Sequence, residues 1–276
     1  MVSVVKGLAF DAKGVAAEFV KARRSAGSLT KYPGAMPSDL ESAYRCQDEA
    51  ISLWDDTIAG WKVGWIPDPL SQKYGAQRLV GPIFSRSVQR ANGSAAFQAP
   101  VFAGGFAAIE AEFVVQLAKD APANVAEWTT ETARRFVRAM YIGIEIASSP
   151  LQNINDYGPA VVASDFGNNA GLLLGVEIVD WQTRSLESLN CETRIEGSVV
   201  GRGSAAAVSG GPLAALAFAL RCNARRGRPL RAGEYVSTGA ATGVHTIGAG
   251  QSAEAIFTGV GSLKCVAVPM TPVTDS

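Results

Sequence analysis

The stretch AAIEAEFVVQLAKD, residues 107–120, reads as an apolar β-strand but carries two glutamates. Residues two apart in a strand point to the same face, with about 6.5 to 7 Å between their Cα atoms, so Glu110 and Glu112 share one face. Ile109, Phe113 and their apolar neighbours take the other face, which is typical of a core. Two like charges on one face of a rigid strand are costly unless they face solvent or bind a cation.

A third glutamate, Glu145, lies in IGIEIASS, residues 142–149, a strand pattern that is otherwise apolar up to its serines. An unpaired ionised group would be costly there, so Glu145 either pairs with an arginine or serves as an oxygen ligand. Divalent cations such as Mg²⁺ and Mn²⁺ prefer oxygen ligands. Three glutamates in apolar strands therefore favour a shared Mg²⁺ or Mn²⁺ site, and a solvent-facing polar strand is the alternative for Glu110 and Glu112.

Four segments have the apolar spacing or the end signals of helices: residues 11–27, 37–54, 129–141 and 209–227. The second is expected to begin with a capping box from Ser38 to Glu41. The third has Thr129 or Thr130 as its expected N-cap, and the fourth has Pro212 in its first turn.

Strands predominate after residue 60. They are predicted around Lys62 in 57–67, over 107–117 and over 142–149, and residues 161–175 are predicted as a turn rich in Asp, Gly and Asn that leads into an apolar strand. A hairpin is predicted over 191–203, closed near Glu196 and Gly197, with short strands over 234–269 and loop and short strand over 78–100. This order predicts an α+β fold built around a curved, mixed sheet. We expect a helical N-terminal region, residues 1–60, and a β-rich region, residues 61–276, in one continuous structural unit.

The composition of the chain argues against several classes of binding partner. The 25 basic and 25 acidic residues give a formal net charge of zero, which argues against binding to nucleic acid or anionic membranes. The start of the chain lacks a long apolar segment, and no stretch reaches the roughly 20 apolar residues of a membrane span. We expect a soluble, cytoplasmic protein.

Cysteine and histidine exclude several kinds of site. The four cysteines are scattered without Cys-x-x-Cys spacing, which favours reduced structural thiols over a zinc site or disulfides. His245 is the one histidine, so a site with two histidine ligands is excluded. It lies near a glycine-rich turn, where we expect a structural role.

Five stretches together resemble the 2-keto-4-pentenoate hydratase branch of the fumarylacetoacetate hydrolase superfamily, in order and spacing, over nearly the whole chain. They are GWKVG (60–64), IEAEF (109–113), IGIEIASS (142–149), VASDFGNNAGLLLG (162–175) and FTGVGSLKCVAV (257–268). The resemblance implies a mixed, rolled β-sheet with a small helical N-terminal region. It also implies Glu110, Glu112 and Glu145 as ligands of Mg²⁺ or Mn²⁺.

The activity implied is a metal-dependent hydro-lyase that adds water to a 2-hydroxy-2,4-dienoate, giving a 4-hydroxy-2-keto acid in aromatic-compound catabolism. Lys62 and Asp165 are then the expected catalytic residues. From the residues alone, Lys62 also fits a lysine extending from a strand end to solvent, and Asp165 also fits a turn.

Four further residues are expected to bind the 2-keto acid substrate. They are Asn168, Thr238, Gly239 and Ser262. Asn168 also suits a turn, and the glycine-rich turns that hold the other three need no ligand. The superfamily's oligomers and mixed complexes imply a homo-oligomer as well as a complex with a related aldolase or decarboxylase.

Three alternatives share the same residues. One is a 2-oxo-3-enedioate decarboxylase, acting on a 4-oxalocrotonate-type substrate. An acylpyruvate hydrolase is another. The superfamily's C–C bond hydrolases are associated with a His-Glu pair in an N-terminal segment, and no histidine precedes position 245 here, so the resemblance disfavours direct hydrolysis. The last is a non-catalytic scaffold paralogue. The stretch RLVGPIFS, residues 78–85, lacks the acid that hydratases of this branch often carry in a Pro-Asp-Phe-Gly motif, so a second proton donor is not identified.

Overall fold

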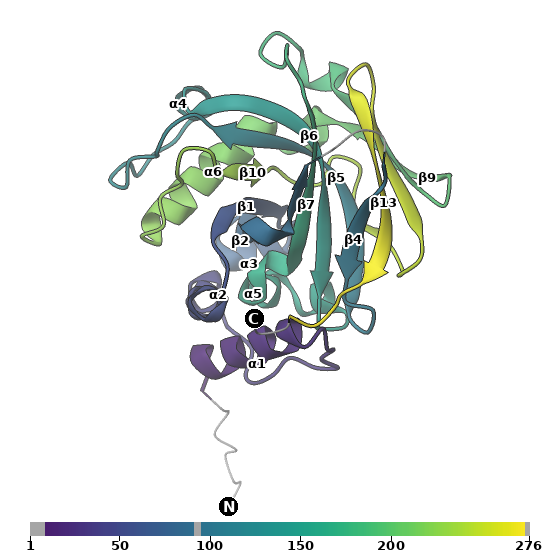
Figure 1. Cartoon of the computed structure of the whole chain (residues 1–276). Coiled ribbons are helices and arrows are strands. Elements are labelled where there is room, and N and C mark those ends of the chain that lie inside the picture. Colours follow the sequence, from purple (N-terminus) through teal and green to yellow (C-terminus); the bar gives the residue numbers. More distant parts are fainter. Residues whose placement is uncertain (1–8, 91–94, 274–276) are drawn as a thin grey trace, which may run out of the picture.

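Two curved β-sheets pack face to face in the computed structural model, which describes residues 9–90 and 95–273 (Figure 1). The start of the chain, where the sequence shows no long apolar segment, includes residues 1–8, which lie outside the described residues. The largest core cluster includes the side chains between the sheets and extends to the helix over Pro212–Arg225. Phe113 of the first sheet meets Phe257 of the second edge to face, with ring centroids 5.4 Å apart. The apolar face predicted for the 107–117 strand therefore points toward the second sheet.

The first sheet has the strand order β2-β1-β10-β5-β6-β7-β3, with β11 paired to β5 beyond the end of β10. Its pairs β1–β10 and β3–β7 are parallel and the others are antiparallel. Its strands are β1 (Ile58–Trp65), β2 (Arg78–Phe84), β3 (Val88–Arg90), β5 (Phe106–Leu117), β6 (Val137–Ser149), β7 (Asn169–Glu177), β10 (Tyr235–Ser237) and β11 (His245–Thr246).

The second sheet has the order β4-β13-β12-β8-β9, with one parallel pair, β13–β4. Its strands are β4 (Phe97–Val101), β8 (Asn190–Ile195), β9 (Ser198–Ser204), β12 (Ser252–Phe257) and β13 (Gly261–Pro269). The β8–β9 hairpin turns at Glu196 and Gly197, whose φ angles of 51° and 76° fit a two-residue hairpin turn. The predicted hairpin and the predicted mixed, rolled α+β fold are both confirmed.

The described residues form six α-helices. They are α1 (Ala12–Arg24), α2 (Leu40–Leu53), α3 (Leu70–Tyr74), α4 (Thr130–Arg134), α5 (Pro159–Ser164) and α6 (Pro212–Arg225). Of these, α2, α5 and α6 contact the first sheet, while α1 packs on α2 and α4 on α6. Pro212 occupies the first turn of α6, and Thr129 caps α4, as predicted. The capping box from Ser38 to Glu41 was wrong: Asp39 is the N-cap of α2 and its side chain accepts from the N–H of Ser42.

Two segments differ from their predicted structure. The helix predicted over 129–141 ends at Arg134, and strand β6 begins at Val137. Pairing along the whole of β5 outweighs the weak local helix preference of this segment. The 78–100 segment is mostly strand, and all seven residues of β2 are buried. Its residues 91–94 lie outside the described residues.

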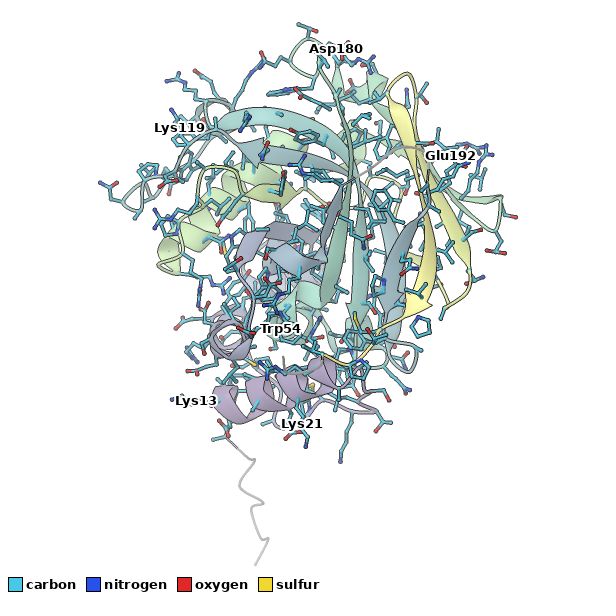
Figure 2. The ribbon with its side chains drawn as sticks, viewed as in Figure 1. Lys13, Lys21, Trp54, Lys119, Asp180 and Glu192 are labelled. Carbon is cyan, nitrogen blue, oxygen red and sulfur yellow. The ribbon has the colours of Figure 1, made fainter. Side chains whose placement is uncertain are left out.

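Helix α1 packs its apolar side against the rest of the molecule. Val15 and Phe19 are buried in a second core cluster with residues of α2 and α5, while Lys13 and Lys21 project outward (Figure 2). Arg23 follows Phe19 by one helical turn and is therefore also on the buried side. No helix among the described residues is long and apolar enough to cross a membrane.

Candidate metal centre

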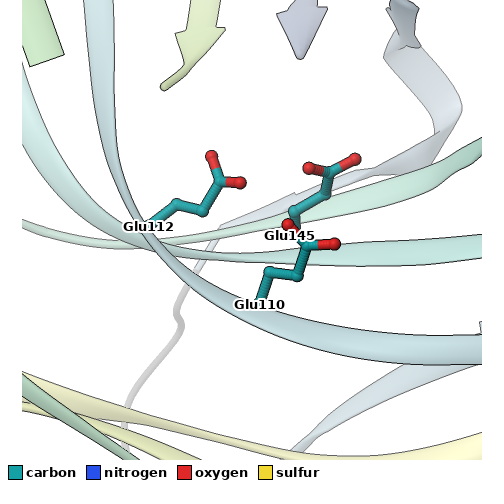
Figure 3. Close-up of side chains that lie close together, drawn as sticks. All are labelled: Glu110, Glu112 and Glu145. Carbon is teal, nitrogen blue, oxygen red and sulfur yellow. The ribbon is translucent and has the colours of Figure 1, made fainter. Parts of the chain in front are cut away.

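The three glutamates come together because β5 and β6 pair in one register. Glu110 lies directly opposite Glu145, and Glu112 lies two residues further along β5 on the same face. Glu110 is 6% exposed, and the other two are fully buried. One carboxylate oxygen from each lies within 4.8 Å of the others. All three side chains point to the same side of the sheet (Figure 3).

This cluster concentrates negative charge in a buried place. Burial and the neighbouring Glu145 raise the pKa of Glu110 to about 7, and the same two causes raise that of Glu112 well above its usual range. Directly opposed like charges destabilise a sheet. When all three glutamates are ionised, Lys62 offsets one of the three charges, and the two that remain equal the charge of one divalent cation.

Lys62 reaches the cluster from β1. Its Nζ lies 3.1 Å from Glu145 Oε1 and donates to the carbonyl oxygen of Gly167 at 3.1 Å and to Asn168 Oδ1 at 3.2 Å. These three acceptors match the three protons of an ammonium group. Burial by itself would lower the pKa of Lys62, but Glu145, Glu110 and Glu112 outweigh it and raise the pKa above its ordinary value.

The unpaired oxygens of the cluster fit a cation. Glu112 Oε2 accepts from Ser237 Oγ at 2.5 Å and from the N–H of Gly239 at 2.9 Å, and Glu145 Oε1 accepts from Asn169 Nδ2 at 3.0 Å. The second oxygens, Glu112 Oε1 and Glu145 Oε2, are buried and have no hydrogen-bond partner among the described residues. Buried carboxylate oxygens need a partner, and a hard cation such as Mg²⁺ or Mn²⁺ would satisfy them.

Asp165 begins the turn that carries Asn168. Its carboxylate pairs with Arg23, with 2.5 Å between Oδ1 and Nε, and its Oδ2 accepts from Ser149 Oγ at 2.6 Å. The structure therefore joins this carboxylate to α1 and β6 rather than to Lys62. Phe166, Gly167 and Asn168 follow with φ angles of 52°, 64° and 56°.

The 165–169 turn lies against β2. A Cβ on Gly81 would lie 2.0 Å from the carbonyl oxygen of Phe166, so this approach requires glycine at position 81. On the same face, a Cβ on Gly64 would lie 3.3 Å from Leu79 and 3.9 Å from Lys62 Nζ. Leu79 is therefore the β2 side chain near Lys62, and residues 78–85 contain no carboxylate.

Of the other three predicted substrate-binding residues, only Gly239 contacts the glutamate cluster. The N–H of Gly239 contacts Glu112, but Thr238 is buried and its hydroxyl donates to the carbonyl of Phe113 at 2.7 Å. Ser262 does not join the cluster. It is exposed on β13 in the second sheet, where Leu263 points to the core, so strand alternation turns Ser262 away from the glutamates.

Three residues near the cluster were not predicted as site residues from the sequence. Ser237 and Asn169 directly adjoin predicted residues in STGAATG and SDFGNNAG, so a wider reading of these stretches would have included them. Arg23 continues the helical spacing of Val15 and Phe19, which indicates a buried arginine. His245 does have local contacts: its Nε2 lies 3.0 Å from the carbonyl oxygen of Thr242.

Residues 76–268, more than half of the chain, match the sequence profile of the fumarylacetoacetate (FAA) hydrolase C-terminal family. The chain belongs to this family. The match contains the three glutamates, the 165–169 turn and Gly239, whereas Arg23 and Lys62 lie before it.

Solved structures share the fold of this FAA hydrolase family member at low identity. The 4-oxalocrotonate decarboxylase of Pseudomonas putida G7, complexed with magnesium and adipate, is 19% identical with a TM-score of 0.78, covering 93% of this chain and 97% of that one. The fumarylpyruvate hydrolase of Pseudomonas aeruginosa, in complex with Mn²⁺ and pyruvate, is 15% identical with a TM-score of 0.53, covering 78% and 93%. The 2-hydroxyhepta-2,4-diene-1,7-dioate isomerase of Mycobacterium marinum is 16% identical with a TM-score of 0.52, covering 78% and 77%.

Proposed function

We propose that this protein is a divalent-metal-dependent decarboxylase of a 2-oxo-3-enedioate, the 4-oxalocrotonate type of substrate. The observation that carries the metal requirement is the pair of bare, buried oxygens on Glu112 and Glu145. Glu110, Glu112 and Glu145 would hold Mg²⁺ or Mn²⁺. When bound, the ion supplies a Lewis acid for a 2-keto acid.

The reaction releases CO₂ from the carboxylate at the far end of the conjugated chain. The C5–C6 bond breaks and its electron pair moves through the conjugated chain to the 2-oxo oxygen. One proton then converts the product into 2-hydroxypenta-2,4-dienoate. The chemistry needs one site for the developing negative charge and one proton donor.

Lys62 is the proposed proton donor. It carries a proton over the ordinary pH range because its pKa is raised, and it lies next to the carboxylate cluster. Gly167 and Asn168 hold its ammonium group in place. Ser237 and Gly239 fix Glu112, and Asn169 fixes Glu145. We assign Asp165 a positioning role, because Arg23 and Ser149 occupy its carboxylate.

The absence of a carboxylate from residues 78–85, which include β2, supports decarboxylation over the hydratase activity that the sequence favoured. Hydration needs a group that deprotonates water in addition to a proton donor. The hydratase branch often has an acid in the stretch that follows the lysine motif, whereas residues 78–85 contain no carboxylate and place Leu79 near Lys62. The overlap with the P. putida decarboxylase, at a TM-score of 0.78 over 93% of this chain, also supports this choice.

An assay of two substrates separates the candidates. Purified protein would be given 2-oxohex-3-enedioate or 2-hydroxypenta-2,4-dienoate with Mg²⁺ or Mn²⁺, and then EDTA. A decarboxylase releases CO₂ from the first and EDTA stops it; a hydratase consumes the second. Metal-dependent turnover of the second substrate alone would assign hydratase activity in place of decarboxylase activity. No turnover of either substrate would reject both activities. The homo-oligomer and the complex with an aldolase or decarboxylase stay predictions.

A further inference from the structure

The N-terminal helix is connected to the glutamate cluster through one side chain. We infer that Arg23 of α1 is a positioning residue that sets the metal affinity of the cluster. This inference rests on the proposed metal-dependent function, and it extends the functional site to a helix that precedes the family match at residues 76–268.

Arg23 is 5% exposed and its guanidinium makes five hydrogen bonds. Two go to the carboxylate of Asp165, from Nε at 2.5 Å and Nη2 at 3.0 Å. Three go to backbone carbonyl oxygens, of Asn169 at 3.0 Å, Asp165 at 3.2 Å and Ser148 at 3.3 Å. The rings of Phe166 and Phe102 lie 5.0 and 5.5 Å from its central carbon.

These contacts hold both ends of the 165–169 turn. Asp165 starts the turn and Asn169 ends it, and the three residues between them all have positive φ. Non-glycine residues in that conformation are held by their surroundings. Ser149, which also donates to Asp165, and Ser148 belong to β6, the strand that carries Glu145. Arg23 thus fixes the turn against the strand of a ligand.

The same turn supplies partners to the cluster. Asn169 donates to Glu145 Oε1 at 3.0 Å, and Gly167 and Asn168 accept from Lys62. A shift of the turn would therefore move the group that orients Glu145 and two of the three acceptors around Lys62. Partners that orient metal ligands typically change metal affinity by about 10- to 100-fold when they are lost.

Arginine has the right shape for this role and lysine does not. A planar guanidinium presents donors in several directions and can bind a carboxylate and nearby carbonyls together. An ammonium could still pair with Asp165, but it could not reach the same set of acceptors. Arg23→Lys therefore preserves the buried charge while loosening the turn.

A matched control separates positioning from general stability. Arg226 at the end of α6 also forms an arginine–aspartate pair, 2.7 Å from Asp48 of α2, and the Arg226 side chain is 9% exposed while that of Asp48 is 31% exposed. Among the described residues, Arg226 contacts Asp48, Tyr44 and Trp61, none of which belongs to the 165–169 turn. Arg226→Lys should reduce the thermal stability without changing the cluster.

The experiment measures Mn²⁺ affinity of the full chain by electron paramagnetic resonance, with thermal melting to verify folding. We expect Arg23→Lys to bind Mn²⁺ about tenfold more weakly than the unmodified protein, and Arg226→Lys to stay within twofold. A folded Arg23→Lys protein with unchanged affinity, or an equal loss in Arg226→Lys, overturns the inference while the metal site stands. Failure of the unmodified protein to bind Mn²⁺ overturns both this inference and the proposed function.

A second variant applies if Arg23→Lys does not fold. Arg23→Gln combined with Asp165→Asn removes both charges together, which avoids leaving one buried charge unpaired. The same weakening of Mn²⁺ binding is expected, because neither amide reproduces the guanidinium contacts. Unchanged affinity in this double variant also overturns the inference. If this variant also fails to fold, the pair serves general stability, and that result counts against a specific positioning role.

Discussion

Glu112 shows how one carboxylate combines two environments. One oxygen is held by Ser237 and Gly239, and the other is buried without a partner among the described residues. The first arrangement fixes the side chain, and the second leaves an oxygen available to a cation. A glutamine would keep the size of the side chain but lose its negative charge.

Glu112→Gln is expected to weaken Mn²⁺ binding by more than tenfold and to abolish turnover, since a ligand charge is lost. Without metal the same variant should melt at a higher temperature than the unmodified protein at pH 8, because burial and like charges make the ionised Glu112 unfavourable. Calorimetric titration and thermal melting measure the two effects. Glu177→Gln, at the exposed end of β7, is the control and should change neither. Unchanged metal affinity in Glu112→Gln would contradict the ligand assignment.

Lys62→Met is expected to retain metal binding but reduce the turnover number by roughly 10² to 10⁴, the usual contribution of a general acid or base. The three ligands stay in place, whereas the ammonium group is removed. Stopped-flow or steady-state assays with 2-oxohex-3-enedioate test this, with Lys264→Met on the exposed face of β13 as the control. Turnover within a few-fold of the unmodified protein would remove Lys62 from the mechanism.

At the scale of elements, the cluster depends on how strands and turns approach each other. The β5–β6 register places Glu110 opposite Glu145, and the 165–169 turn packs on β2 through the missing side chain of Gly81. A slip of one residue in the register would turn the glutamates to the opposite face.

Gly81→Ala tests the contact between β2 and the turn. A Cβ at 2.0 Å from the carbonyl of Phe166 must push the turn away from β2, which typically costs about 1 to 3 kcal/mol in unfolding free energy. Chemical denaturation should show this loss, and Mn²⁺ affinity should fall with it because Asn169 moves. Gly248→Ala, where a Cβ meets only an ordinary contact with Gln251, is the control. A Gly81→Ala protein as stable as the control variant would mean that the turn is free to shift.

The sequence predicted the strand carrying Glu110 and Glu112 because alternation and charge are local patterns. It also predicted the β8–β9 hairpin and α6, whose end signals lie within a few residues. It missed the early end of α4 and the extent of β2, because strand pairing over long sequence distances overrides local preference. Ser262 was assigned from a glycine-rich turn, but the side to which its strand faces depends on the packing of two sheets.

For the molecule as a whole, a rise in pH should lower the stability of the metal-free protein, whereas bound metal should raise it. The folded-state pKa of Glu110 is about 7, above its ordinary value of 4.5. A carboxyl with a raised pKa favours the fold while it is protonated, and that contribution is lost as the pH rises from about 4.5 through 7. Bound metal requires the ionised form, so protons compete with it at low pH.

Metal-free protein is therefore expected to melt at a lower temperature at pH 8 than at pH 5.5, and added Mn²⁺ should raise the melting temperature much more at pH 8. At a metal concentration of 100 times the dissociation constant, the gain is about 2.7 kcal/mol. Scanning calorimetry with EDTA or Mn²⁺ at both pH values measures this, and Glu112→Gln should lose most of the metal effect. An equal Mn²⁺ effect at both pH values would show that these carboxyls do not titrate with the bound ion.

The contacts of the glutamate cluster also set the order in which the site can be completed during synthesis. Arg23 leaves the ribosome early, whereas Gly239, whose N–H holds Glu112, is made more than two hundred residues later. A nascent chain that stops before the end of β10 has all three glutamates but lacks Ser237 and Gly239, the groups that fix Glu112. For the proposed metal site, tight binding of the ion is therefore expected only after residue 239 has been synthesised, and incomplete chains should bind metal weakly.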